Sequence, residues 1–200
     1  MRLLSRLATC AVTLFLAATF ARAAAPNPIT LDQIMAALHS VHHVEARYIE
    51  RRYLHALRSP LETRGTLRFD APDHLEKETD PAVNGSADRL TIKGNQLTID
   101  RGTGATPMIL ALNEHQEIRV LVDSIRATLA GDGSTLQRTF EVTPSGTLEE
   151  WELVLQPRDD HRRGLLQWMR IGGHGDRITA IDTRDGEGDR SEMSIVELRR

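Results

Sequence analysis

The sequence predicts one α+β domain that is dominated by a curved antiparallel sheet. The first observation is a series of about ten short segments in which apolar and polar residues alternate between turn residues, as in antiparallel sheets. The second is a pair of amphipathic helical patterns, which must cover an apolar face of that sheet. The third is the aromatic content of only 4%, which predicts a mostly aliphatic core.

Two segments have helical periodicity. Thr30 is a suitable N-cap, and Gln33 follows at capping-box spacing, so a first helix is expected over residues 31–43. Its apolar face consists of Leu31, Ile34, Met35 and Leu38. The second helical pattern is the strongest in the chain and has Gly131 as a suitable stop. Its apolar stripe consists of Ile118, Leu121, Val122, Ile125 and Leu129.

The rest of the chain is expected to be mainly extended. The clearest hairpin spans residues 88–100, where apolar and polar residues alternate on both sides of a Gly94-Asn95 turn. Gly172-Gly173 and residues 185–189 are expected to separate the last strands. The other expected extended or short apolar segments are 46–57, 61–70, 74–79, 107–112, 136–143, 151–157, 164–171, 177–184 and 191–199.

The first 23 residues have the three parts of a secretory signal peptide. Arg2 and Arg6 form a positive start, residues 7–20 are apolar, and Ala21-Arg22-Ala23 offers a cleavage site. The apolar run is shorter than the roughly 20 residues of a permanent membrane span. Thr9 is large for the residue before a lipidated cysteine, so Cys10 is taken as part of the apolar run. We therefore expect cleavage after about Ala23 and a single exported domain over residues 24–200.

Charge and cysteine content exclude several classes of function. Removal of residues 1–23 takes away three arginines and no acid, so the formal net charge falls from −3 to −6. Such a chain has no electrostatic reason to bind nucleic acid or to coat an anionic membrane. Because the exported part contains no cysteine, it has neither disulfides nor thiol chemistry.

No group of residues predicts catalysis, a metal or a cofactor. The sequence lacks a phosphate-binding glycine loop, an HExxH motif, a CxxC motif and a Gly-x-Ser-x-Gly elbow. His39 and His43 have a spacing that can hold a metal, but no third ligand is identifiable. Glu76 and Glu78 could imitate a glycosidase pair, yet a solvated strand face explains them better. Residues 185–189 are taken as a hairpin turn and not a calcium loop.

What remains is the chemistry of a hydrophobic container. A curved sheet with aliphatic side chains, covered by amphipathic helices, can hold an acyl chain and gains roughly 0.8 kcal/mol per buried CH₂ group. The same alternation of Leu, Ile and Val is found in any packed β core. Composition alone therefore leaves two alternatives open, a hollow core and a filled one.

The order of elements resembles the LolA family of periplasmic outer-membrane lipoprotein carriers, over most of residues 28–198. The resemblance is carried by the capped first helix, by Gly65-Thr66-Leu67-Arg68-Phe69 running into Pro72, and by the Gly94 hairpin before the central helix. It is most similar to a divergent branch found with glycolipid and aryl-polyene biosynthesis proteins. The segments that carry this closer resemblance are residues 57–61, 72–79, 125–132 and 188–193.

The resemblance implies an unclosed half-barrel with a helical lid over an apolar cavity. It implies a non-enzymatic periplasmic carrier, without a cofactor, that takes acylated cargo from an inner-membrane donor and gives it to an outer-membrane acceptor. The implied cavity residues are Leu67, Phe69, Leu90, Ile92, Leu97, Ile99, Trp151, Leu153 and Leu155. The implied lid residues are Ile118, Leu121, Val122, Ile125 and Leu129.

One position departs from the family pattern. The better-known carriers have an Arg before the proline, and it hydrogen-bonds to the lid, whereas this chain has Ala71 before Pro72. The lid latch must therefore differ or be absent, and the cargo can equally be a lipoprotein, a lipid or a lipid-linked polyene. A lipid-sensing regulatory module on the same fold, without transport, is the main alternative function. A small-barrel enzyme and a structural domain with a filled core are the others.

Overall fold

The computed structural model describes residues 28–81, 87–102, 104 and 106–199. Within them, one antiparallel sheet of 11 strands has the order β6-β5-β4-β3-β2-β1-β11-β10-β9-β8-β7. The strands are β1 (His43–Tyr53), β2 (Leu61–Asp70), β3 (His74–Thr79), β4 (Asp88–Lys93), β5 (Gln96–Asp100), β6 (Met108–Ala111), β7 (Phe140–Gly146), β8 (Trp151–Pro157), β9 (Leu166–His174), β10 (Arg177–Asp185) and β11 (Arg190–Arg199). Because β6 and β7 are the two end strands, the sheet is not closed.

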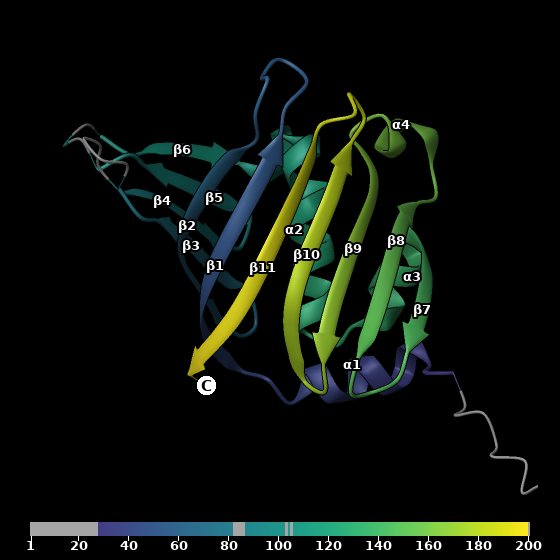
Figure 1. Ribbon diagram of the computed structural model, residues 1–200. Helices are drawn as coiled ribbons and strands as arrows, with labels where there is room; N and C mark the ends of the chain where they lie inside the picture. Colours follow the sequence, from purple (N-terminus) through teal and green to yellow (C-terminus); the bar gives the residue numbers. More distant parts are fainter. Residues whose placement is uncertain (1–27, 82–86, 103, 105, 200) are drawn as a thin grey trace, which may run out of the picture.

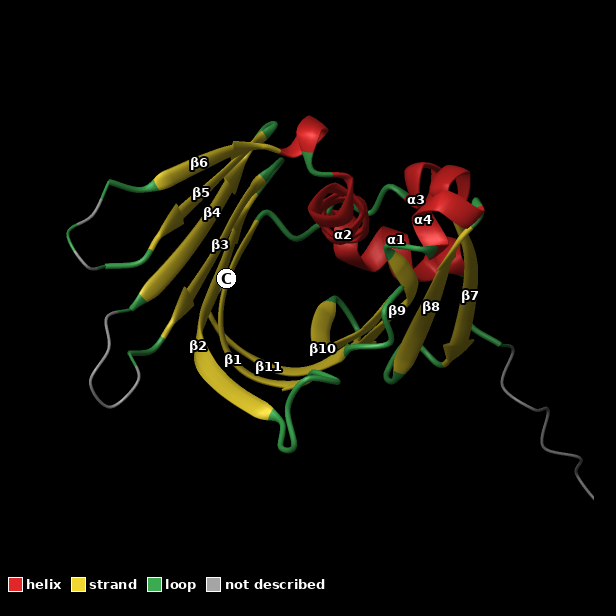
Figure 2. Ribbon diagram, turned by 90° about the horizontal axis from the view of Figure 1, so that it is seen from above, coloured by secondary structure: helices red, strands yellow, loops and turns green. Residues whose placement is uncertain are grey.

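The sheet curves into a half-barrel with helices at its open side. Figure 1 shows the strands side by side in front of the helices, and Figure 2 shows the sheet as a U with α2 in its mouth. The helices are α1 (Leu31–His39), the 3-10 turn η1 (Leu112–Glu114), α2 (Gln116–Leu129), α3 (Gly133–Thr139) and α4 (Asp160–Arg163). The predicted class, α+β with a curved unclosed antiparallel sheet, is confirmed.

Local sequence signals account for the elements that were predicted well. The capping box is present, since the Thr30 side chain accepts from the Gln33 backbone and the Gln33 side chain accepts from the Thr30 backbone. Gly94 has φ 56° in the turn between β4 and β5, a conformation that glycine adopts without steric cost. Gly131 has φ 65° just after α2, so it ends the strongest helix as expected.

Four boundaries differ from the sequence expectation. The first helix ends at His39, and His43 already pairs with Asp70 in the sheet. Residues 136–139 are helical and not extended, because the Asp132 side chain caps α3 by accepting from the Thr135 backbone. Gly172 and Gly173 lie inside β9, and residues 160–163 form the short helix α4.

The core consists of two separate clusters. The larger one fills the space between α1, α2, α3 and the strands β7–β9, and it includes Ile34, Leu136 and Met169, each fully buried. The smaller one joins α2 to β4–β6 through Leu97, Leu112 and Val122. The larger core therefore lies in the half of the U that is formed by β7–β9, and Ile178 and Ile181 of β10 pack against its edge.

The glycine at position 173 is required by the larger core. A Cβ atom there would lie 2.1 Å from Cζ2 of Trp151, whose ring is buried and whose Nε1–H donates to the Gly175 carbonyl. We expect Gly173→Ala to destabilise the fold by about 1–3 kcal/mol, as overpacking does. Gly172→Ala is the matched control, because its Cβ would meet Ala180 at an ordinary 3.6 Å. Urea unfolding of both variants measures the difference, and equal stability would contradict the account.

The cap of α3 makes a pH-dependent contribution to stability. Hydrogen bonds from Thr135 and Ser134 lower the pKa of Asp132 to about 2. Because this folded value is below the ordinary one, the contribution is present above about pH 4 and is lost as pH falls towards 2. Asp132→Ala should cost about 1 kcal/mol at pH 7, and clearly less near pH 2. If chemical denaturation shows that Asp132→Ala lowers the free energy of unfolding equally at both pH values, this assignment is overturned.

The predicted signal peptide, residues 1–23, lies outside the described residues. In the part of the chain that is described, no helix has the length and apolar character needed to cross a membrane.

Candidate functional site

A cavity of about 460 Å³ lies between the concave face of the sheet and helix α2. This size is within the range of about 300–1,000 Å³ that is common for small-molecule pockets. Its lining is mainly aliphatic. The apolar residues contributed by the sheet, α1 and their connections are Leu38, Val41, Val44, Ala46, Leu54, Leu67, Phe69, Leu75, Leu90, Ile92, Leu165, Leu166, Met169, Ile178, Ile181, Met193 and Ile195.

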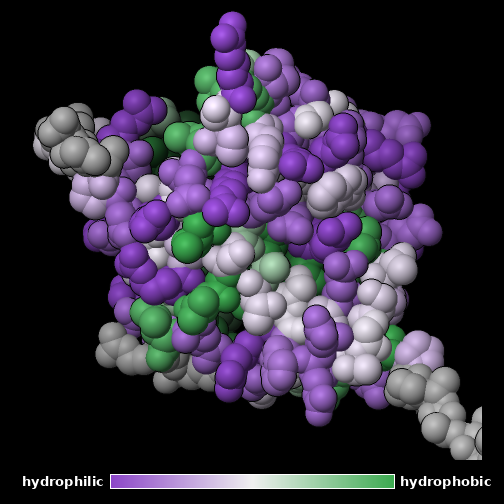
Figure 3. All heavy atoms as spheres, in the orientation of Figure 1, coloured by the Kyte–Doolittle hydropathy of each residue, from purple (hydrophilic) through white to green (hydrophobic). Residues whose placement is uncertain are grey.

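Strand alternation aims these side chains into the cavity. In β1, Val44 and Ala46 point inward, and in β11 Met193 and Ile195 do so, two residues apart as the pleat requires. The residues between them face the convex side, which Figure 3 shows as largely hydrophilic. Hydrophobic side chains such as Ile49 and Val196 are exposed on that side.

Helix α2 closes the cavity opposite the sheet. All five residues that were predicted for the lid lie in the lining: Ile118, Leu121, Val122, Ile125 and Leu129. The helix is held from both sides, because Val120 and Ala127 belong to the larger core while Val122 belongs to the smaller one. Helix α2 therefore lies across the open side of the curved sheet, above a space that neither core cluster fills.

Part of the lining is less completely buried than a packed core. Leu67, Leu75, Leu121, Ile125 and Ile181 are only half-buried although they face the interior of the fold. Leu153, Leu155 and Ile171, in the filled half of the same sheet, are completely buried. The half-buried side chains of the lining thus keep apolar surface that a packed interior would cover, whereas other lining residues, such as Leu38 and Met169, are fully buried.

Four of the nine residues expected on the sheet side lie in the lining: Leu67, Phe69, Leu90 and Ile92. The other five lie elsewhere. Trp151, Leu153 and Leu155 belong to the larger core, because α1, α2 and α3 cover β8. Leu97 and Ile99 pack in the smaller core with Leu112 and Val122. The structure thus moves these five from the expected cavity lining to packed positions, and we propose no ligand contact for them.

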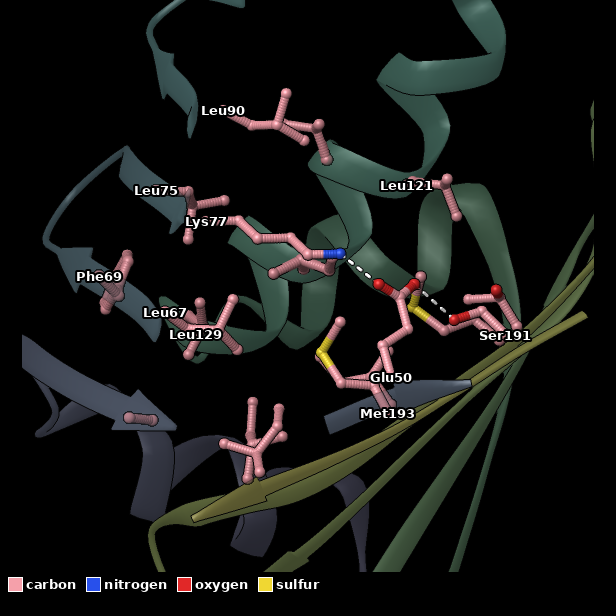
Figure 4. Close-up of a pocket in the computed structure, with 18 of the residues that line it drawn as sticks. Glu50, Leu67, Phe69, Leu75, Lys77, Leu90, Leu121, Leu129, Ser191 and Met193 are labelled. Atoms are coloured by element: carbon pink, nitrogen blue, oxygen red, sulfur yellow. Dashed lines mark hydrogen bonds and ion pairs between the residues drawn. The ribbon is translucent and has the colours of Figure 1, made fainter. Parts of the chain in front are cut away.

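A polar cluster interrupts the apolar lining. Glu50 on β1 is 7% exposed, and its carboxylate accepts hydrogen bonds from Lys77 on β3 and from the Ser191 hydroxyl on β11 (Figure 4). Burial opposes ionisation of this carboxyl, but the charge of Lys77 and the two hydrogen bonds outweigh it, so the pKa of Glu50 lies below its usual value. The cluster is therefore an ion pair inside an apolar cavity.

Helix α2 is tied by hydrogen bonds to two turns of the sheet. Arg126, on α2, donates from Nη1 to the Gly94 carbonyl at 2.7 Å and from Nη2 to the Asp73 carbonyl at 2.8 Å. The Asp73 side chain accepts from the Gly94 backbone, which ties the two turns together. An arginine of the lid thus holds the turn that follows Pro72, so the latch differs from the pattern implied by an arginine at position 71.

The histidines and the paired glutamates are accounted for by local contacts. His39 bonds to the Ala130 carbonyl and His43 to Asp70. Glu78 is bonded to Arg89, which also lies near Glu76. Among the described residues, no group of three or more His, Cys, Asp or Glu side chains has the geometry of a metal site.

The sequence did not predict most of the cavity floor, which is the part of the lining contributed by β1, β3, β10 and β11. Strand β1 alternates from Val44 onward, and this signal could have identified Ala46 and Glu50 as inward-facing. Lys77 is one of only two lysines in the chain and follows Leu75 at the same alternation. The pairing of Glu50 with Lys77, however, depends on the order of strands, which local patterns do not reveal.

Comparison with known proteins gives one family match. A family model described as outer membrane lipoprotein carrier protein LolA-like matches residues 23–196. No curated protein matches the chain significantly. The chain is similar to a LolA superfamily protein, NE2245, from Nitrosomonas europaea, with TM-score 0.45 and 12% identity over 86% of this chain and 94% of that one. It is also similar to a Vibrio parahaemolyticus domain described in terms of outer membrane lipoprotein sorting, with TM-score 0.45 and 9% identity over 84% and 90%.

Proposed function

Because the chain belongs to the outer membrane lipoprotein carrier protein LolA-like family, we propose that it is a carrier that shelters the acyl part of a hydrophobic cargo in the cavity under α2. The family consists in general of carriers and not of catalysts. The cargo is an acylated molecule, either a lipoprotein or a lipid. No group in the cavity has to react with it, since burial of CH₂ groups supplies the affinity.

The half-buried aliphatic lining is the observation that carries this proposal. A core residue such as Leu153 is fully buried, whereas Leu67 and Leu121, which both line the cavity, are only half-buried. Apolar surface left accessible inside a fold is a binding surface, because a filled core would be more stable. An acyl chain in this space would complete the contacts that the lining lacks.

Entry and release require α2 to move. The helix spans the mouth of the U between two clusters and is fixed near its C-terminal end by Arg126. A latch made of two hydrogen bonds to backbone carbonyls can open without breaking strand pairing. Transfer is then driven by differences in affinity between donor, carrier and acceptor, without ATP at the carrier.

The proposed cellular location and partners are based on the same family. We place the protein in the periplasm, with cleavage after about Ala23, an inner-membrane donor and an outer-membrane acceptor. Within the family, residues 57–61 and 72–79 support the branch found with glycolipid and aryl-polyene biosynthesis proteins. A lipid or a lipid-linked polyene therefore suits the cavity as well as a lipoprotein does.

The main alternative is a lipid-sensing module that binds but does not deliver. A transfer assay between two vesicle populations separates the two functions. Donor vesicles contain a fluorescent fatty acid, and acceptor vesicles contain a quencher. A carrier at a small molar ratio to lipid accelerates quenching in proportion to its concentration. A protein that binds the probe stoichiometrically without accelerating transfer would be a sensor, and one that does neither would refute both proposals.

A further inference from the structure

The cavity contains an ion pair, Glu50 with Lys77, that a pure hydrocarbon site would not need. Figure 4 shows the Lys77 ammonium and the Glu50 carboxylate pointing towards each other in the space below α2, with Ser191 beside them. They come from β3, β1 and β11, so the cluster joins three strands on the floor of the cavity. The surrounding lining is aliphatic, with Leu67, Leu75 and Met193 nearby.

Stability alone does not explain this pair. Removing two charges from water is costly, and a buried ion pair is often no more stabilising than apolar residues of the same size. The sheet does not need the pair either, because β2 pairs with β1 from His43 to Arg52 and with β3 from His74 to Thr79. A polar group placed in an otherwise apolar pocket usually serves to orient a ligand.

The cluster has unused donors but few unused acceptors. Both Glu50 oxygens already accept, Oε2 from Lys77 and Oε1 from Ser191. Lys77 has three N–H donors; one bonds to Glu50, and the ammonium also lies 4.8 Å from the centre of the Tyr48 ring. Two ammonium hydrogens are therefore available to a ligand without breaking the Glu50 pair.

A second cation lies next to this cluster. Arg52 is opposite Ser191 in the β1–β11 register, lines the cavity, and is close enough to Glu50 for its charge to favour ionisation there. Among the described residues, no acceptor makes a hydrogen bond or ion pair with its guanidinium, and the nearby carboxylate of Asp189 accepts from His55 instead. Asp185, also in the lining, accepts from the backbone of its own turn.

We propose that Lys77 and Arg52, with Glu50 and Ser191 holding Lys77 in place, form a head-group subsite for an amphiphile with an acidic head. The head accepts hydrogen bonds from the two cations, and its acyl chain lies along the aliphatic lining towards α2. A carboxylate and a phosphate monoester share this chemistry. The inference rests on the proposed function, because the chain of the same ligand occupies the cavity.

The test compares three single-chain probes on the full-length exported protein at about pH 8, by titration calorimetry. The probes are hexadecanoate, its methyl ester and hexadecyl phosphate. We expect the acidic probes to bind at least about tenfold more tightly than the ester, since charge-assisted hydrogen bonds are the strong ones. The ratio of the dissociation constants of hexadecanoate and hexadecyl phosphate then identifies which acidic head group the subsite prefers.

The variants separate the head-group subsite from the cavity. In the triple variant Lys77→Met, Arg52→Met and Glu50→Gln, both proposed cations are removed and no buried charge is left unpaired, so the fold should persist by circular dichroism. It should bind the ester as the unmodified protein does and show no preference for the acids. Lys93→Met is the matched control, because Lys93 is the other lysine and is exposed at the end of β4. It should keep the full preference.

Two results would overturn the inference, and they differ in meaning. If the unmodified protein binds the ester as tightly as the acids, or if the triple variant keeps the preference, the subsite is wrong while the carrier proposal stands. If none of the three probes binds, the carrier proposal fails and the subsite fails with it.

Discussion

Replacing Leu121 or Ile125 with aspartate should abolish uptake of a fluorescent fatty acid while the sheet stays folded. Both side chains line the cavity from α2 and are half-buried. Each loses its apolar contact with the ligand, worth about 1.5–3 kcal/mol when complete, and the new carboxylate resists desolvation by an acyl chain. We therefore expect affinity to fall by at least about tenfold, the equivalent of 1.4 kcal/mol.

A matched variant distinguishes a cavity effect from a general effect of added charge. Val196→Asp introduces the same group on the convex face, where Val196 is 66% exposed, and should leave uptake unchanged. Circular dichroism and urea unfolding report on the fold. If Leu121→Asp or Ile125→Asp unfolds the whole protein, these residues are ordinary core, and the hollow interior is refuted.

Replacing Arg126 with methionine should accelerate ligand release by about tenfold or more. The variant keeps an unbranched apolar stem but loses two hydrogen bonds to the Asp73 and Gly94 carbonyls. Hydrogen bonds from a charged donor contribute about 1.5–3 kcal/mol when buried, and these are only partly so. Stopped-flow transfer of the bound probe to excess vesicles measures the release rate.

Arg119→Met is the control for the latch. Arg119 lies on the same helix, is exposed, and makes only a surface pair with Asp123, so its loss should change release little. An equal acceleration in both variants would mean that charge on α2, and not the latch, controls release. An unchanged rate in Arg126→Met would show that the lid does not open at this end.

The sequence predicted the lid better than the floor of the cavity. A helix displays its apolar stripe in one stretch of chain, so Leu121 and Ile125 were identifiable from spacing alone, and the structure places both in the lining. The resemblance implied Leu67 and Ile92 as cavity residues, and the alternation of their strands agrees with their place in the lining. In these places local periodicity and tertiary position agree.

The misplaced residues show what periodicity leaves out. Trp151, Leu153 and Leu155 alternate as cavity residues would, and only the position of α1 and α3 above β8 makes them packed core. The helix α3 itself was missed because its N-cap, Asp132, acts on a short segment without a clear apolar stripe. The Glu50–Lys77 pair spans strands β1 and β3, so it follows from strand order and not from any one segment.

Native mass spectrometry of the exported protein, purified without detergent and followed by solvent extraction, tests the hollow interior most directly. We predict a co-purified acyl-bearing molecule at close to one per chain, and its loss from the Leu121→Asp variant. A clean mass without ligand, together with no uptake of added fluorescent fatty acid, would contradict the account. The aliphatic lining would then be packed core in solution, and the function of the protein would lie on its surface.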